Sequence, residues 1–141
     1  MKLTKLEVAA HQLNVAIRLF LDDDYLSSLT LAGAAEEILG KLSEREGRTK
    51  AVDSICEYHW KDTDPELPDK ERRKLLMDLL NGARNAAKHA NDPNELDFEV
   101  EQIFPLQMMM RAMSMARSLG AVYEYEGRMV AWIRSHPEAC Q

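Results

Sequence analysis

The chain has 141 residues, enough for one domain whose hydrophobic core needs neither disulfides nor metal ions. Hydrophobic residues make up 45% and charged residues 30%, with only 6 glycines and 5 prolines, which excludes a disordered or β-rich chain and predicts a mostly helical globule. The net charge of −6 argues against a protein that coats nucleic acid through bulk electrostatics.

The sequence lacks the usual signals of export, of a membrane span, and of a cofactor or metal site. The two cysteines, Cys56 and Cys140, have no C-x-x-C spacing and follow no secretory leader, so we expect reduced thiols in a cytoplasmic protein. No apolar run approaches the length of a membrane span, and we expect no membrane partner. No Gly-rich phosphate loop is present, and His59 has no second His or Cys at ligand spacing, so we expect no cofactor and no metal.

The first half of the chain predicts three helices. Apolar residues at helical spacing indicate an amphipathic helix from about residue 6 to residue 22. The acidic triplet 22–24 can cap a second helix from about Tyr25 to Glu46, because Asp side chains accept hydrogen bonds from free N–H groups at a helix start. Gly47 is the expected stop of this helix. A shorter helix around 50–60 follows, and the prolines after it predict an exposed loop from Pro65 to Asp69.

Three more helices are predicted in the second half. Asp69 is the expected N-cap of the fourth helix, which should stop at residues 91–93. The fifth should span about 98–119, with Pro105 in its first turn or at a kink. After Gly120 the apolar spacing favours a sixth helix, although residues 123–127 also alternate like half a hairpin.

These elements predict an all-α fold, an up-and-down helical bundle with four core helices plus shorter ones. We expect the first, second, fourth and fifth helices to lie antiparallel around one core. The predicted buried side chains are Leu13, Ile17, Leu39, Leu76 and Leu80. Five methionines between residues 108 and 115 surround most of the fifth helix, which favours core packing but also allows contact with a second subunit.

The segment Arg84-Asn85-Ala86-Ala87-Lys88-His89, near the end of the fourth helix, is the strongest candidate for chemistry. Residues 69–92 carry a net charge of +2, whereas the remainder of the chain carries −8. A locally positive helix in an acidic protein could admit a few phosphates, although a solvated charged face is the commoner explanation of such counts.

Arginine, a polar residue directly after it and a histidine five positions on resemble the R-x4-6-H signature of the HEPN superfamily. The segment 32–39 resembles the small-residue and acidic segment that precedes this helix in that family. The resemblance covers about residues 6–119. It implies an HEPN-like helical bundle over residues 1–120, with residues 121–141 as a C-terminal extension that we expect to be helical and packed on the same domain.

The resemblance also implies a function and partners. It implies a toxin-like, metal-independent endoribonuclease that acts on RNA as a homodimer, often with a separate nucleotidyltransferase-type antitoxin. His89 would be the general acid or base and Arg84 the phosphate stabiliser, with Asn85, Glu36 and Lys88 in supporting roles. Histidine titrates near neutrality and a guanidinium fork matches phosphate oxygens, so both roles are physically reasonable.

Helix geometry adds an argument for the dimer. On an ideal helix Arg84 and His89 lie roughly 140° apart, whereas Asn85 and His89 share a face. One helix therefore cannot easily direct both side chains at one phosphate, and two copies about a two-fold axis could. Glu36 has small residues as its helical neighbours, so we expect it to be more buried than Glu37 and paired with Arg84 or His89.

Other interpretations stay open. Arg84 and His89 could be a solvated arginine and a histidine that complements the helix dipole. The chain could be a non-catalytic helical module that binds a nucleotide, or a partner protein through the methionine-rich helix. It could also be a purely structural dimer.

Overall fold

The computed structural model describes residues 1–140, and these residues form six α-helices and two short 3₁₀ helices without a β-strand. The all-α prediction is therefore confirmed for the described chain. The elements, in chain order, are α1 (Lys5–Leu21), α2 (Tyr25–Arg45), α3 (Ala51–His59), η1 (Trp60–Asp62), α4 (Asp69–Lys88), α5 (Ile103–Ser118), α6 (Glu126–Ser135) and η2 (Pro137–Cys140).

The starts of α1 and α2 follow from local side-chain chemistry. Thr4 and Glu7 form a reciprocal capping box: the Thr4 hydroxyl accepts from the Glu7 N–H at 3.1 Å, and the Glu7 carboxylate accepts from the Thr4 N–H at 2.7 Å. The Asp24 side chain accepts from the Ser27 N–H at 3.1 Å, which confirms the predicted acidic cap of α2. Gly47, with φ of +68°, ends that helix as expected.

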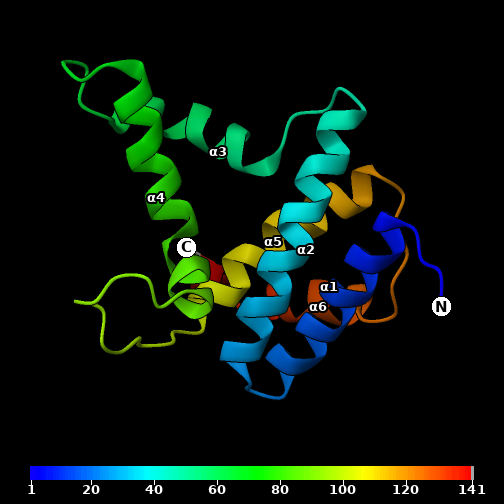
Figure 1. The fold of residues 1–141 in the computed structure, drawn as a ribbon. Coiled ribbons are helices and arrows are strands. Elements are labelled where there is room, and N and C mark those ends of the chain that lie inside the picture. Colours follow the sequence, from blue (N-terminus) through cyan, green and yellow to red (C-terminus); the bar gives the residue numbers. More distant parts are fainter. Residues whose placement is uncertain (141) are drawn as a thin grey trace.

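The core lies where α1, α2 and α5 pack against one another, and α6 covers one side of it (Figure 1). Leu13, Ile17 and Leu39 are buried as predicted. Alanines on the facing sides of these helices let the backbones approach closely, and they are Ala9, Ala16, Ala32, Ala35, Ala112 and Ala116. The buried Ser28 hydroxyl donates to the Ala16 carbonyl at 2.7 Å, so its burial leaves no unpaired donor.

Helix α4 differs from the prediction, because it is not a core helix. Leu76 and Leu80 are only half-buried, and Asn81 is the one buried residue among those of α4. Together with α3, α4 forms an arm to one side of the bundle (Figure 1). The physical reason lies in its small residues: α4 packs on the core through Ala83 and Ala87, while its leucine-rich half extends beyond the bundle.

The loop before α4 is exposed at Pro65, Glu66, Pro68 and Asp69, as predicted, although Leu67 is half-buried. Asp69 is the first helical residue rather than the N-cap, which is Pro68. Proline fits this place because it needs no N–H partner at a helix start.

After α4, the chain departs from the prediction mainly at the start of α5. Helix α5 begins at Ile103, five residues later than expected, with the buried Pro105 in its first turn. Met108, Met109 and Met115 are buried, so core packing of the methionine-rich helix is confirmed. The last twenty residues that the structure describes include helix α6 and no hairpin.

Helix α6 is held against the bundle by three contacts along its length. The Asn14 side chain accepts from the Tyr125 N–H at 2.7 Å, Met129 is fully buried, and the Trp132 ring packs edge-on against Phe20 at 4.9 Å between centroids. The C-terminal segment therefore packs on the same core as the other helices.

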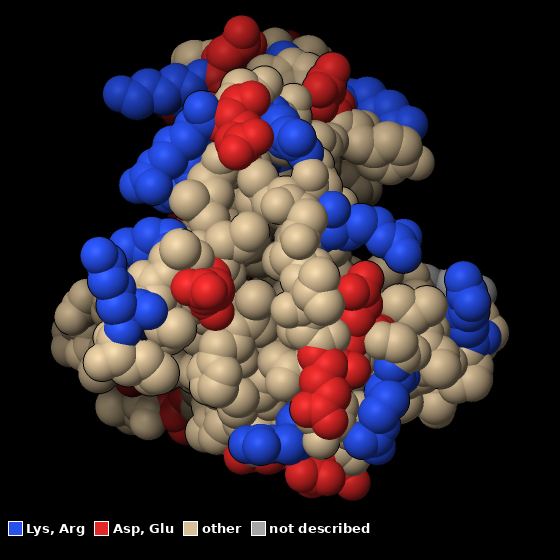
Figure 2. All heavy atoms as spheres, turned by 90° about the vertical axis from the view of Figure 1, so that its right-hand side faces the viewer, with Lys and Arg blue, Asp and Glu red and all other residues tan. Residues whose placement is uncertain are grey.

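Charges are mixed on the surface. On the face shown in Figure 2, Lys and Arg side chains are interspersed with Asp and Glu around a broad area without charged residues. Among the helices of residues 1–140, none is both long enough and apolar enough to cross a membrane.

Candidate functional site

Three charged side chains from three helices meet beneath the predicted motif. Glu36 of α2 lies between two guanidinium groups: its Oε2 is 3.3 Å from Nη1 of Arg84 on α4, and its Oε1 is 2.8 Å from Nη2 of Arg111 on α5. All three side chains are largely buried, with exposed fractions of 5% for Glu36, 14% for Arg84 and 6% for Arg111. We call these three residues the Arg–Glu–Arg cluster.

Arg111 is held more firmly than Arg84. Its Nη1 donates to the Leu80 carbonyl at 3.0 Å, and its Nη2 donates to Asn81 Oδ1 at 3.0 Å as well as to Glu36. These bonds explain why Asn81 is the buried residue of α4: it completes the shell around a buried charge.

Gly33 provides the space in which Arg84 reaches Glu36. A Cβ atom at this position would lie 2.6 Å from both Cγ and Cδ of Arg84, closer than unbonded carbon atoms can approach. The missing side chain on α2 therefore lets the aliphatic part of Arg84 cross directly over the helix. The small-residue segment of α2 thus has a defined structural role.

The cluster contains two cations and one anion, so its formal charge is +1. The Nε–H groups of Arg84 and Arg111 are both buried and have no hydrogen-bond partner among the described residues. A buried charge without a counter-ion is costly, and this excess raises the affinity of the adjoining surface for anions.

Arg84 also lines a basic groove between α2 and α4. The cavity has a volume of about 570 Å³ and is lined by five basic side chains and one acidic one, among apolar and small residues. The charged lining residues are Lys5, Lys41, Arg45, Arg84, Lys88 and Glu37. We call this cavity the basic groove. Its excess of positive charge suits a phosphate-bearing ligand.

The prediction for Glu36 is confirmed. Glu36 is buried with an exposed residue fraction of 4%, whereas Glu37 is exposed and pairs only loosely with Lys88, at 3.7 Å between Nζ and Oε2. Of the two partners proposed for Glu36, Arg84 makes the contact.

The structure places His89 differently from the prediction. Helix α4 ends at Lys88 rather than at residues 91–93, and His89 is an exposed C-cap residue with extended backbone, φ −129° and ψ 148°. The ideal-helix angle of roughly 140° between Arg84 and His89 therefore does not describe this end of the helix. The cause is local: His89 still bonds the Asn85 carbonyl through its N–H, at 2.9 Å, but the chain then leaves the helix toward Pro93.

The predicted site residues are therefore only partly brought together. Glu36 contacts Arg84, and Lys88 lines the same groove as Arg84. Asn85 and His89 are both exposed, and no hydrogen bond or ion pair among the described residues joins either side chain to Arg84. One copy of the chain does not assemble the complete predicted site.

Arg111 was not identified from the sequence, although a signal for it exists. It is the one charged residue in the run Leu106 to Ala116, and most residues of that run are apolar. A lone cation on an apolar helix needs a buried counter-ion. Glu36 on α2 is the complementary case, an acidic residue among small and apolar neighbours.

Comparisons of this chain with protein-family models, with curated proteins and with solved structures found no match.

Proposed function

We propose that the chain is an HEPN-like RNA-binding protein that acts as a homodimer and cleaves single-stranded RNA without a metal ion. The observation that carries this proposal is the basic groove, because five basic side chains surround it in a protein with a net charge of −6. Arg84 and Lys88 of the motif both line the groove, and His89 directly follows Lys88. The groove thus supplies a phosphate site beside the residues that the resemblance marks.

In this proposal the cleaved bond lies near the end of α4. His89 removes the proton from a ribose 2′-OH or protonates the leaving oxygen, and the 2′-oxygen attacks the adjacent phosphorus, which releases a 5′-OH and leaves a 2′,3′-cyclic phosphate. Arg84 stabilises the negative charge of the phosphorane. Glu36 holds Arg84 in place, Lys88 attracts the phosphate, and Asn85 orients the nucleotide.

Two features of α4 support the proposed homodimer. The first is that one chain leaves Arg84 and His89 unconnected. The second is an apolar stripe on the exposed side of α4, where Leu75 and Leu79 are 53% and 80% exposed. Gly82 and Ala86 continue this stripe at helical spacing toward His89. Exposed leucines on a projecting helix are typical of a surface that a partner covers, and a two-fold axis there would join two motif ends.

The experiment is an RNA cleavage assay of the purified protein in EDTA. His89→Ala should abolish cleavage, whereas His11→Ala, which removes another exposed histidine on α1, should leave it unchanged. Equal cleavage by wild type and His89→Ala would contradict the catalytic role.

RNA binding has its own test, which is the salt dependence of affinity. Each phosphate contact to a single strand contributes about 0.7 to the slope of log K against log salt concentration. Lys41→Ala should lower the slope by about this amount, and Lys61→Ala, an exposed lysine of η1 on the arm, should not.

The dimer is tested by sedimentation. Leu79→Asp should shift the protein to a monomer and reduce cleavage, because it places a charge on the apolar stripe. Leu96→Asp is the matched control, since Leu96 is 90% exposed but lies outside α4. A monomeric wild type that still cleaves RNA would contradict the composite site.

A second function is favoured by two observations. Arg84 is already paired with Glu36, and the His89 side chain has no described partner to orient it. Both features fit a non-catalytic module that binds a nucleotide or a partner protein, such as the nucleotidyltransferase-type antitoxin that the resemblance implies. RNA or nucleotide binding without any cleavage would support this alternative.

A further inference from the structure

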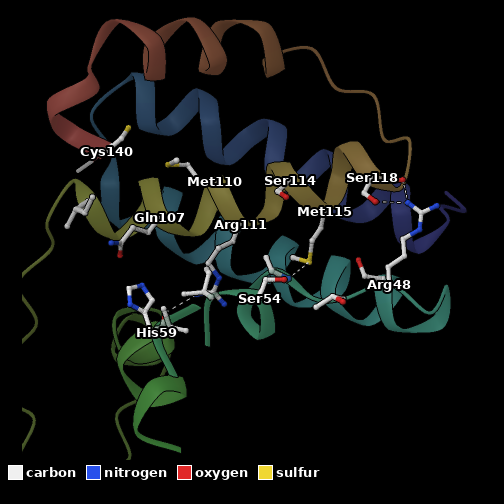
Figure 3. A pocket seen from close by; sticks show the side chains of 16 residues that line it. Arg48, Ser54, His59, Gln107, Met110, Arg111, Ser114, Met115, Ser118 and Cys140 are labelled. Atoms are coloured by element: carbon white, nitrogen blue, oxygen red, sulfur yellow. Dashed lines mark hydrogen bonds between the residues drawn. The ribbon is translucent and has the colours of Figure 1, made fainter. Parts of the chain in front are cut away.

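A second cavity lies between α3 and α5, and the proposed RNA site does not use it (Figure 3). Its volume is about 600 Å³, which is within the range of pockets that hold small molecules. Arg48 stands at one end and His59 at the other, while Arg111 reaches from α5 toward α3 between them (Figure 3). We call it the α3–α5 cavity.

One end of the α3–α5 cavity is rich in hydrogen-bonding groups. Arg48, in the loop after α2, donates through Nη1 to the carbonyl and the hydroxyl of Ser118, and the Ser118 Oγ lies 2.6 Å away. Its nearest carboxylate is Glu46 at 3.8 Å, and both side chains are about half-exposed, so this ion pair neutralises Arg48 only weakly. Thr49 and Ser43 line the same cavity and can add donors for an anionic group.

The other walls are apolar. Ile55 of α3, Leu80 of α4, and Ile103 and Met110 of α5 line the cavity. Met110 is 39% exposed, whereas Met108, Met109 and Met115 of the same helix are buried. A thioether side chain at the mouth of a pocket can adapt to ligands of different shape.

The charge balance favours an anion over a neutral ligand. Two of the described lining residues are arginines, and none is acidic. Arg111 lines the cavity as part of the Arg–Glu–Arg cluster, in which two guanidinium groups share one carboxylate. Its side chain is 94% buried, and its Nε–H has no partner among the described residues. The excess positive charge of the cluster therefore lies at the inner wall of this cavity, where burial of the Arg111 side chain reduces screening by water.

We propose that the α3–α5 cavity binds a small amphipathic organic anion. A carboxylate or phosphate group of the ligand pairs with Arg48 and the hydroxyl groups near it, and its apolar body lies against Ile55, Leu80 and Met110. Carboxylate and phosphate groups are both anions that accept hydrogen bonds from a guanidinium and from hydroxyl groups. The site is separate from the basic groove, so the proposal stands whether or not the chain cleaves RNA.

The test is calorimetric titration of the full chain with five defined probes. Octanoate, hexyl phosphate and AMP represent a carboxylate, a phosphate on an aliphatic body and a phosphate on an aromatic body. Inorganic phosphate lacks the apolar body, and 1-hexanol lacks the charge. At least one organic anion should bind at submillimolar concentration, and the two incomplete probes should bind at least tenfold more weakly. The preferred head group identifies the class of ligand.

Two variants locate the site. Arg48→Ala should weaken binding about tenfold or more, while Arg45→Ala, which removes the same charge from the basic groove, should change it less than twofold. Ser54→Trp fills the cavity from an exposed position on α3 and should abolish binding without unfolding the protein. Thermal unfolding checks that each variant is folded.

The proposal is wrong if none of the three organic anions binds at millimolar concentration. It is also wrong if Arg48→Ala and Ser54→Trp bind as tightly as the wild type. Wild-type affinity in His89→Ala is expected, and it would show that the two sites are separate.

Discussion

Replacing Glu36 by glutamine tests whether the Arg–Glu–Arg cluster is an essential part of the fold. Glutamine has nearly the same shape, so the substitution removes the negative charge without opening a cavity. It leaves two largely buried guanidinium groups, 3.3 and 2.8 Å from the former carboxylate oxygens, without a counter-ion. Removing one partner of a buried ion pair destabilises a protein by about 3–5 kcal/mol.

We expect Glu36→Gln to lie near the lower value, about 3 kcal/mol, because the amide oxygen can still accept one hydrogen bond. For a domain of this size that loss corresponds to a fall in Tm of about 10 °C. It is a large part of a typical unfolding free energy, which is about 5–15 kcal/mol. The adjacent Glu37→Gln is the matched control and should change stability by less than about 0.5 kcal/mol, because Glu37 is exposed and 3.7 Å from Lys88.

The assay is urea unfolding followed by circular dichroism, at two protein concentrations so that dissociation of the proposed dimer is separated from unfolding. An equal and small loss in Glu36→Gln and Glu37→Gln would refute the argument that the cluster stabilises the buried end of the site.

Three further predictions use the same measurement. Gly33→Ala should destabilise the protein although alanine favours helices, because the new Cβ would displace Arg84. The control Gly127→Ala, with open space around the new Cβ, should be neutral or stabilising by about 0.5 kcal/mol. A Gly33→Ala variant as stable as the wild type would show that Arg84 moves freely. Arg84→Met should cost less than Glu36→Gln, since it removes the excess charge and leaves a balanced pair; a larger loss would contradict this charge count. Burial raises the pKa of the Tyr123 hydroxyl above its ordinary value of 10, so the unfolded chain loses this proton first and stability should fall as pH rises above about 10. Tyr123→Phe should flatten that fall and cost little at pH 7, because the hydroxyl has no described partner. An unchanged slope of stability against alkaline pH would show that Tyr123 does not cause the fall.

Much of the fold could be predicted from the sequence because its signals are local. Helical spacing of apolar residues identified all six α-helices, and the acidic triplet before Tyr25 and the glycine at position 47 predicted both ends of α2. The start of α5 was less well predicted, since the apolar residues Phe98 and Val100 precede the methionine-rich run but do not belong to the helix.

The position of α4 could not be predicted, because an amphipathic pattern does not say which neighbour covers the apolar face. Leu76 and Leu80 fit a core stripe as well as an arm, and only the packing of Ala83 and Ala87 decides between them. The candidate site was predictable in part for a similar reason. Glu36 was marked by its small neighbours, whereas the pairing with Arg111 joins residues 75 positions apart and depends on how three helices cross.

The most direct test of the central claim uses one RNA in two forms. A single-stranded RNA that the protein cleaves in EDTA is compared with the same strand carrying a 2′-deoxynucleotide at the cleavage position, and each is incubated with wild type and with His89→Ala. If His89 and the ribose 2′-OH carry out the proposed reaction, only the unmodified strand is cleaved, only by the wild type, and the product carries a 2′,3′-cyclic phosphate. Cleavage of the 2′-deoxy strand at that position, undiminished cleavage by His89→Ala, or no cleavage of any single-stranded RNA by the dimer would contradict it.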